Sequence, residues 1–361
     1  MLSGLLYRPD WPEARHRLTT WWHGSDIGRP AMAITVPRQT PLEEIPELPA
    51  PAGCLAPNYT TRDMEFRVNQ ARRACLWNDY LGEAVPAVSA GDLAPNCLAL
   101  YLGCRGVEGY DTTWCEPFID DTERDGFAYD PGNFYWRFSL EAFRRVLPLA
   151  QGKFLHQFPD LIEGLDTLAA MRGTERLLTD LIEQPEWVHA SLRTITDLYF
   201  RYYDVLYDLL RDEVGGSIYW LWAPGRLTKL QCDFSAMISP TMFREFMVPV
   251  LTEMTERVSY SLYHLDGPGA ICHLDHLLSI PRLGMIQWQP GAGNESAPHP
   301  RWWPLYHRIL DAGKKLMVWA ESRDDLLSYK REFGDKCKAM YISASARTIA
   351  EADELLKAME F

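Results

Sequence analysis

The chain has 361 residues, of which 47% are hydrophobic and 24% charged, and this composition is typical of a globular protein with a sizeable core. Its formal net charge of -13 at pH 7 argues against nucleic acid and anionic membranes as partners. The sequence shows no secretory leader, no apolar run of about 18 residues and no CxxC pair among its 8 cysteines. We therefore expect a cytoplasmic protein with reduced thiols.

The first part of the chain mixes short ordered segments with irregular ones. Apolar, β-branched runs predict strands, and amphipathic runs predict helices. Clusters of Gly, Asp and aromatic residues indicate irregular structure. In chain order we expect an N-terminal arm over 1–30 with a helix near 12–23, a strand over 31–36, a helix over 61–81, a strand over 85–89 and an irregular excursion over 104–135.

From residue 139 onward, short apolar strands alternate regularly with amphipathic helices. One of these helices is expected to begin after Ser239 as its N-cap, with Pro240 in its first turn. The eight predicted strands of the whole chain cover 31–36, 85–89, 154–158, 217–223, 261–265, 284–288, 316–320 and 339–343. This alternation predicts an α/β protein with a parallel sheet, and most simply a (β/α)8 TIM barrel with an N-terminal extension, forming one domain over 1–361. An open, doubly wound sheet is the alternative.

Polar and aromatic residues gather where the predicted strands end. In a barrel the active site lies at the carboxyl ends of the strands. An acid at such a position often caps the next helix, and a buried histidine is often structural, but the joint pattern favours a site. Apart from the fifth predicted strand, 261–265, and the residues just after it, the candidates are Asp92, His156, Asp160, Trp222, Arg226, Asp233, Gln287, Trp288, Trp319 and Glu321.

The stretch LYHLDGPGA, residues 262–270, carries the sharpest signal. His264 and Asp266 lie two apart on a predicted strand, so they share one face and could bind a metal or act as acid and base. In the purely structural alternative, Asp266 caps the Gly-Pro-Gly turn and His264 donates to a backbone carbonyl. A mononuclear zinc site usually takes three protein ligands, and the third would be Glu321 or Asp233.

Three stretches resemble the uroporphyrinogen decarboxylase superfamily, which includes cobamide-dependent methyltransferases that act on methylated thiols, methanol and chloromethane. They are CDFSAMISPTMFREFMVP, LYHLDGPGA and IQWQPGAG. The similarity covers roughly residues 150–361, whereas WWHGSDIGRPAMAITVPR fits more loosely. The resemblance implies a (β/α)8 barrel with its site at the C-terminal mouth, and often a homodimer.

The chain departs from both well-known branches of that superfamily. The tetrapyrrole decarboxylases bind propionates through an Arg-rich N-terminal segment, and the matching place here keeps only Arg38. The methyltransferases hold zinc with His-x-Cys after the fifth strand and a Cys after the eighth. Here the first motif is His264-Leu265-Asp266, and ISASA, residues 342–346, has no Cys. We therefore expect an oxygen-rich site for zinc or another divalent metal.

The leading hypothesis is an enzyme that acts on a small polar substrate by metal-assisted methyl transfer or by decarboxylase or lyase chemistry. Methyl transfer would need a separate corrinoid protein, since the chain has no DxHxxG motif. The proposed catalytic residues are His264, Asp266, Glu321 and Asp160, with His264, Asp266 and Glu321 as metal ligands; the proposed substrate-binding residues are Asp92, His156, Trp222, Arg226, Asp233, Gln287, Trp288 and Trp319. Uroporphyrinogen decarboxylase proper is disfavoured. A barrel that binds or processes sugars or polyols is the other alternative, because 13 Trp are available for stacking.

Overall fold

The computed structural model describes residues 4–361 and shows a mixed α/β protein built on a largely parallel sheet of seven strands. The strand order is β2-β1-β13-β12-β11-β10-β9, and only the β1–β2 pair is antiparallel. The strands are β1 (Ala31–Pro37), β2 (Asn78–Gly82), β9 (Leu227–Gln231), β10 (Tyr260–Asp266), β11 (Met285–Gln289), β12 (Lys315–Trp319) and β13 (Met340–Ser345).

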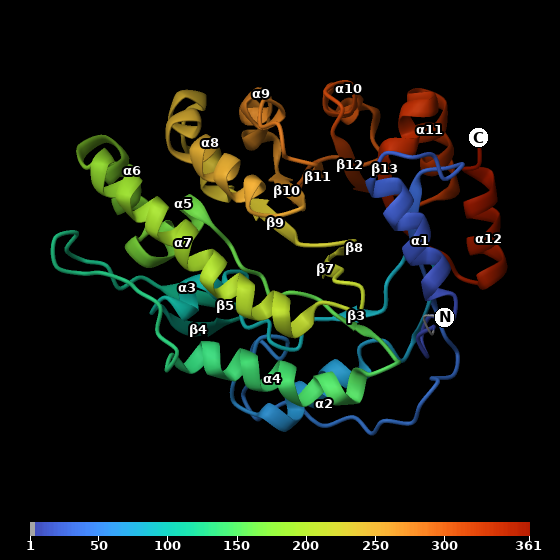
Figure 1. Cartoon of the computed structure of the whole chain (residues 1–361), viewed down its shortest axis with the longest axis horizontal. Helices are drawn as coiled ribbons and strands as arrows, with labels where there is room; N and C mark the ends of the chain where they lie inside the picture. Colours follow the sequence, from blue (N-terminus) through green and yellow to red (C-terminus); the bar gives the residue numbers. More distant parts are fainter. Residues whose placement is uncertain (1–3) are drawn as a thin grey trace.

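Helices connect and cover these strands. Figure 1 shows α8, α9, α10 and α11 following one another along one side of β9 to β13, with α2 and α4 on the opposite side of the molecule. The helices are α1 (Trp11–Trp22), α2 (Met64–Arg73), α3 (Cys97–Tyr101), α4 (Phe134–Ala150), α5 (Gly164–Arg172), α6 (Thr174–Glu183), α7 (Pro185–Leu210), α8 (Pro240–Glu256), α9 (Leu274–Leu278), α10 (Trp303–Asp311), α11 (Arg323–Phe333) and α12 (Ile349–Ala358). Short 3₁₀ turns add η1 (Asp233–Met237), η2 (Pro268–His273), η3 (Pro300–Trp302) and η4 (Gly334–Ala339).

Three two-stranded sheets complete the described part of the chain: β3 (Ala87–Val88) with β6 (Leu155–His156), β4 (Arg105–Gly109) with β5 (Thr112–Glu116), and β7 (Ser217–Tyr219) with β8 (Leu221–Ala223). Only the first pair is parallel. Hydrogen bonds link the first and third of these small sheets to each other and to β9. The N–H of Phe158, just after β6, donates to the carbonyl of Ile218 in β7 at 3.1 Å. The Leu227 N–H donates to Ser217 Oγ at 2.9 Å.

Several expectations from the sequence are confirmed. The predicted strands over 31–36, 261–265, 284–288, 316–320 and 339–343 correspond to β1, β10, β11, β12 and β13. Their apolar runs reflect parallel strands that are buried on both faces. Ser239 is the N-cap of α8, with its Oγ accepting from Met242 N–H at 3.2 Å, and Pro240 opens the helix. Among the described residues, no helix is both long and apolar enough to cross a membrane.

Three predicted elements are wrong in part. The helix expected over 61–81 ends at Arg73, and residues 78–82 instead form the edge strand β2. The run 217–223 does not form one strand, because the chain reverses at Trp220 between β7 and β8. The strand that joins the main sheet is β9, which the sequence did not suggest. The excursion over 104–135 contains the β4–β5 hairpin.

A buried ion network fixes the N-terminal segment against the sheet. Glu83, which follows β2, is fully buried. Its carboxylate accepts from Arg29 at 2.6 and 2.9 Å, from Arg17 at 2.7 Å and from the backbone N–H of Met32 at 2.8 Å. These charge-assisted bonds hold the pKa of Glu83 below its usual value despite burial. The network therefore links α1, β1 and β2 through one carboxylate.

Candidate functional site

Polar side chains converge at the carboxyl ends of β9, β10 and β11. In the parallel register, His264 of β10 lies opposite Gln231 of β9 on one side and Gln287 of β11 on the other. Two residues later, Asp266 pairs with Gln289. Because side chains two apart share a face, these groups point to the same side of the sheet. The expectation that His264 and Asp266 share a face is confirmed.

The three side chains of Asp233, His264 and Asp266 form a group that could hold a metal ion. One ligand atom from each lies within 4.8 Å of the others. Asp233 comes from η1, directly after β9, so it approaches His264 from the neighbouring strand. An imidazole and two carboxylates suit zinc and other divalent ions and leave room for a substrate or water ligand.

Glu321, which the sequence offered as the third ligand, lies outside this group. It follows β12, which is two strands away from β10 in the sheet. Neighbouring strands are spaced by about 4.8 Å, so β10 and β12 lie about 10 Å apart, and Glu321 is not among the residues whose ligand atoms approach His264. Glu321 is exposed, and its backbone N–H donates to Asp325 at the start of α11. The structure therefore favours Asp233, the other candidate, as third ligand.

Hydrogen bonding orients the imidazole of His264. Its Nδ1 bonds to Oε1 of Gln287, and the Gln287 amide nitrogen donates to the carbonyl of Trp288 at 3.0 Å. With its oxygen turned to the ring, Gln287 accepts from Nδ1–H, which leaves Nε2 free as the ligand atom. Burial lowers the pKa of His264 and so favours the neutral, ligating form. Gln287 is thus an orienting residue for His264.

One oxygen of Asp266 lacks a hydrogen-bond partner in the described part of the chain, and Asp233 lies close to other negative charges. Oδ1 of Asp266 is buried and has no hydrogen-bond partner among residues 4–361. Burial, together with the negative charges of the nearby Asp166 and Asp266, raises the pKa of Asp233 to about 7. A bound cation would relieve both conditions, since it supplies the positive charge that these oxygens lack. The residues present therefore fit a divalent ion.

Asp166 and Gln231 position Asp233 rather than joining it as ligands. The Asp166 carboxylate accepts the backbone N–H groups of Asp233 and Phe234, each at 2.8 Å. The Gln231 amide donates to Asp233 at 3.1 Å and to Asp166 at 3.2 Å. These bonds fix the turn η1 and aim Asp233 at β10. On the other side, Gly267 has φ 75°, a left-handed conformation that lets the chain turn directly after Asp266.

A buried ion pair lies beside the metal-ligand group. Nζ of Lys229 lies 2.6 Å from Oδ1 of Asp160, and the Lys229 side chain is almost fully buried. The charge on Asp160 acts on the pKa of both His264 and Asp233, which places it near the group. Asp92 supports Asp160 from behind, accepting its backbone N–H at 3.0 Å. Burial raises the pKa of Asp92 to about 6.

Trp220 contributes a wall that the sequence analysis did not select. Its indole meets the His264 ring edge to face, with ring centroids 5.5 Å apart. The chain reversal at this residue directs Trp222 away instead: the Trp222 indole N–H donates to Asp212 at 2.8 Å, and the ring packs on Trp11. The prediction that Trp222 lines the site is therefore wrong. No sequence signal marks this reversal, because SIYWLWA is typical of one continuous strand.

Two further predicted substrate-binding residues, Trp288 and Arg226, lie elsewhere. Trp288 points to the opposite face of β11 from Gln287 and packs on Trp302 at 4.9 Å. Arg226 pairs with Asp204, and its guanidinium lies over the rings of Tyr203 and Tyr207 at 4.7 and 5.0 Å.

His156 is buried near Phe154. Burial lowers its pKa to about 4, and its Nδ1 has no partner among the described residues. Of the other predicted residues, Trp319 lines a small cavity together with Trp220, His264 and Gln287. Four polar residues near the group were missed from the sequence, namely Asp166, Lys229, Gln231 and Gln289.

Glu163, which precedes α5, gives a pH-dependent prediction. Its Oε1 accepts Gln231 N–H at 2.8 Å, and burial raises its pKa to about 8. Between about pH 4.5 and 8 the folded chain keeps a proton that the unfolded chain releases, so this group makes the free energy of unfolding fall as pH rises, by at most about 1.4 kcal/mol per pH unit. Glu163→Gln, which cannot ionise, is expected to remove that slope in urea unfolding at pH 5 and pH 8. An unchanged slope would contradict the assignment.

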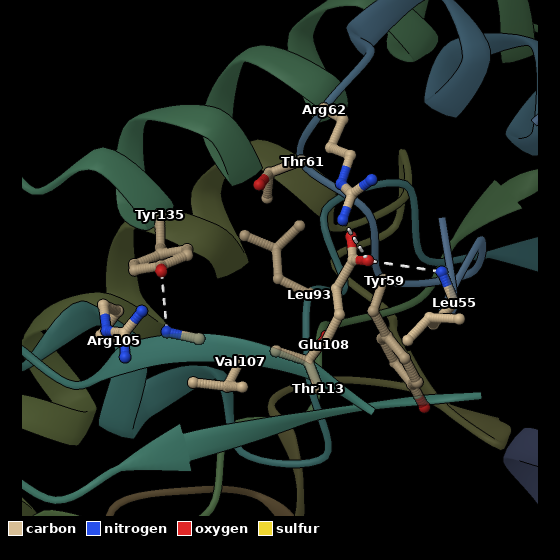
Figure 2. Close-up of a pocket in the computed structure, with 11 residues that line it drawn as sticks. Leu55, Tyr59, Thr61, Arg62, Leu93, Arg105, Val107, Glu108, Thr113 and Tyr135 are labelled. Carbon is tan, nitrogen blue, oxygen red and sulfur yellow. Dashed lines mark hydrogen bonds and ion pairs between the residues drawn. The ribbon is translucent and has the colours of Figure 1, made fainter. Parts of the chain in front are cut away.

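A separate cavity of about 420 Å³ lies between β4 and the loop that carries Tyr59 and Arg62 (Figure 2). Its charged groups are already paired. Arg62 bonds Glu108 at 2.7 Å, and Arg105 bonds Glu116 at 2.6 Å. The Tyr135 hydroxyl accepts the N–H of Gly106 at 2.7 Å. Because these groups satisfy one another, this cavity offers less chemistry than the strand ends.

No family model matches the chain, and no match to it is found among curated proteins.

Proposed function

We propose that this protein is a metal-dependent enzyme that acts on a small polar substrate at the carboxyl ends of β9, β10 and β11. The observation that carries the proposal is the approach of Asp233, His264 and Asp266, whose ligand atoms lie within 4.8 Å of one another. Three protein ligands leave an open position for substrate. When bound there, a divalent ion would act as a Lewis acid on a substrate oxygen or sulfur.

The chain's own residues supply the remaining functions. Asp160, held by Lys229 at 2.6 Å, is the carboxyl group placed to exchange a proton with a bound substrate. Trp220 and Trp319 border the adjoining cavity and limit access of water. Gln287 keeps the imidazole of His264 in its ligating tautomer. Glu321 has no part in this assignment, since it lies beyond β12.

We further propose that the fold is a (β/α)8 barrel of the uroporphyrinogen decarboxylase superfamily. The parallel sheet, the hydrogen bond from Phe158 after β6 to β7 and the hydrogen bond between β9 and β7 support a closed barrel, whereas the superfamily assignment rests on the sequence resemblance over residues 150–361. The reaction is then methyl transfer with a separate corrinoid protein, or decarboxylase or lyase chemistry. Decarboxylation of uroporphyrinogen itself remains disfavoured, because Asp160, Asp233 and Asp266 would repel its carboxylates.

Turnover by the loaded protein tests the proposal. Protein loaded with zinc or manganese is mixed with reduced cobalamin, a stand-in for the corrinoid partner, and with methanol, dimethyl sulfide or choline, and methyl-cobalamin formation is followed by absorbance. Release of CO₂ from small carboxylic acids tests the lyase arm. Activity that disappears on chelation and in Asp266→Asn supports the proposal. Activity that survives both treatments contradicts it, and stabilisation by sugars alone would favour a polyol-binding protein.

A further inference from the structure

A small cavity of about 270 Å³ lies directly beside the metal-ligand group. Ligand pockets usually measure about 300–1,000 Å³, so this cavity suits only a compact group. It is lined by Trp220, His264, Gln287, Gln289, Met317, Val318, Trp319 and Ser343. Two indoles and two aliphatic side chains therefore form much of its wall, and His264 connects it to the group that we assign to the metal.

Trp220 adopts a left-handed backbone conformation that steric clashes disfavour for a residue with a bulky side chain. Its φ is 60°, a left-handed value that costs a bulky residue about 1–3 kcal/mol. Its side chain nevertheless remains 40% exposed. The backbone N–H donates to Oε1 of Gln157 at 2.9 Å, which holds the turn in place. A strained backbone that presents an exposed indole beside a candidate catalytic group indicates contact with a ligand.

The charges around the cavity favour a cation. The carboxylates of Asp160, Asp233 and Asp266 lie near His264, as does the single ammonium of Lys229. Lys229 is already paired with Asp160 at 2.6 Å, so it offers no free positive charge to an anion. Asp92 and Asp166 stand behind these groups and add negative charge. Even with a divalent ion bound, the five carboxylates outnumber the three positive charges of the ion and Lys229, so the field attracts a cation and repels an anionic substrate.

The hydrogen-bonding capacity of the wall narrows the kind of cation. The Gln287 amide is committed at both ends, to His264 and to the Trp288 carbonyl. Gln289 and Ser343 each offer an acceptor oxygen, but Met317, Val318 and the two indole faces accept no conventional hydrogen bond and form much of the wall. A primary ammonium or a sugar would therefore leave some of its donors unpaired against this wall, whereas a quaternary ammonium has none to satisfy. Aromatic faces, with Trp the most effective, attract such methylated cations.

We infer that this cavity binds the quaternary ammonium group of a small substrate, with Trp220 and Trp319 against its methyl groups. The inference rests on the proposed function, because it places the other end of the substrate at the Asp233, His264 and Asp266 group. It adds a substrate class, small methylated ammonium compounds, to that function. Trp220 is then a specificity-determining residue.

Calorimetric titration of the full, metal-loaded protein tests the inference with a matched pair of ligands. Choline carries the quaternary ammonium, and 3,3-dimethyl-1-butanol has the same shape without the charge. Choline is expected to bind at least tenfold more tightly. Trp220→Leu and Trp319→Leu should each weaken choline binding about tenfold and reduce this preference. Trp114→Leu, an exposed indole on β5, should leave it unchanged.

Metal content measured on the same samples separates this inference from the proposed function. Trp220→Leu and Trp319→Leu should retain the wild-type metal content, which also shows that the site remains folded. Equal affinity for choline and its neutral analogue, no binding of choline, or full choline binding in both tryptophan variants overturns the inference. If instead Asp266→Asn keeps its metal while the choline preference persists, the assigned metal group is wrong and the quaternary ammonium site stands.

Discussion

Asp266→Asn is expected to lower bound divalent metal from about one ion per chain to a small fraction of that, and His264→Ala should do the same. Each change removes one of only three protein ligands, and the remaining two hold an ion weakly. Asp266 is the sharper test, because its Oδ1 is buried without a hydrogen-bond partner among residues 4–361. Elemental analysis of purified protein after incubation with zinc or manganese provides the measurement.

Glu321→Gln is the matched control for these variants. Glu321 also follows a strand of the sheet, but it is exposed and lies outside the metal-ligand group. Its removal should leave metal content unchanged. Gln287→Leu should have an intermediate effect and lower the affinity for the metal ion about 10–100-fold, because Gln287 orients His264 without touching the ion. Loss of metal in Glu321→Gln but not in Asp233→Asn would reverse the assignment of the third ligand.

Glu83→Gln is expected to destabilise the fold by about 3–5 kcal/mol, the usual consequence of removing one partner from a buried ion pair. The substitution leaves Arg29 buried without a counter-charge and weakens the bonds from Arg17 and Met32 N–H. Since these bonds connect α1, β1 and β2, the loss should lower the free energy of unfolding of the whole domain. Urea unfolding followed by circular dichroism measures the change.

Glu116→Gln is the corresponding control. Glu116 pairs with Arg105 at 2.6 Å on the exposed β4–β5 hairpin, where solvent screens the interaction. The variant should unfold at the same urea concentration as the wild type. If Glu83→Gln is equally silent, the network around Glu83 does not secure the N-terminal segment.

The sequence predicted the fold best where periodicity and capping agree. The five strands from β10 to β13 and β1 are apolar and bounded by turns, and Ser239–Pro240 marks the start of α8. His264 and Asp266 were found because strand periodicity alone places them on one face. Asp233 was one of two candidates for a third ligand, but its closeness to His264 depends on β9 lying next to β10, and the sequence did not suggest β9.

The remaining errors have local physical causes. LTKLQ, which forms β9, mixes polar residues into a buried strand, because Lys229 and Gln231 serve the site rather than the core. The reversal at Trp220 needs a left-handed tryptophan, which residue preferences disfavour. Both errors change which residues are expected at the strand ends, and the second explains why Trp222 was selected from the sequence and Trp220 was not. Local rules fail here at the places where the candidate site is built.

The most direct test of the metal assignment is an anomalous difference map from zinc-loaded crystals, recorded on both sides of the zinc absorption edge. Our account predicts a single strong peak within bonding distance, roughly 2.0–2.2 Å, of His264 Nε2 and of one oxygen each from Asp233 and Asp266. A peak at Glu321 or elsewhere, or no peak at the ends of β9 and β10, would contradict it.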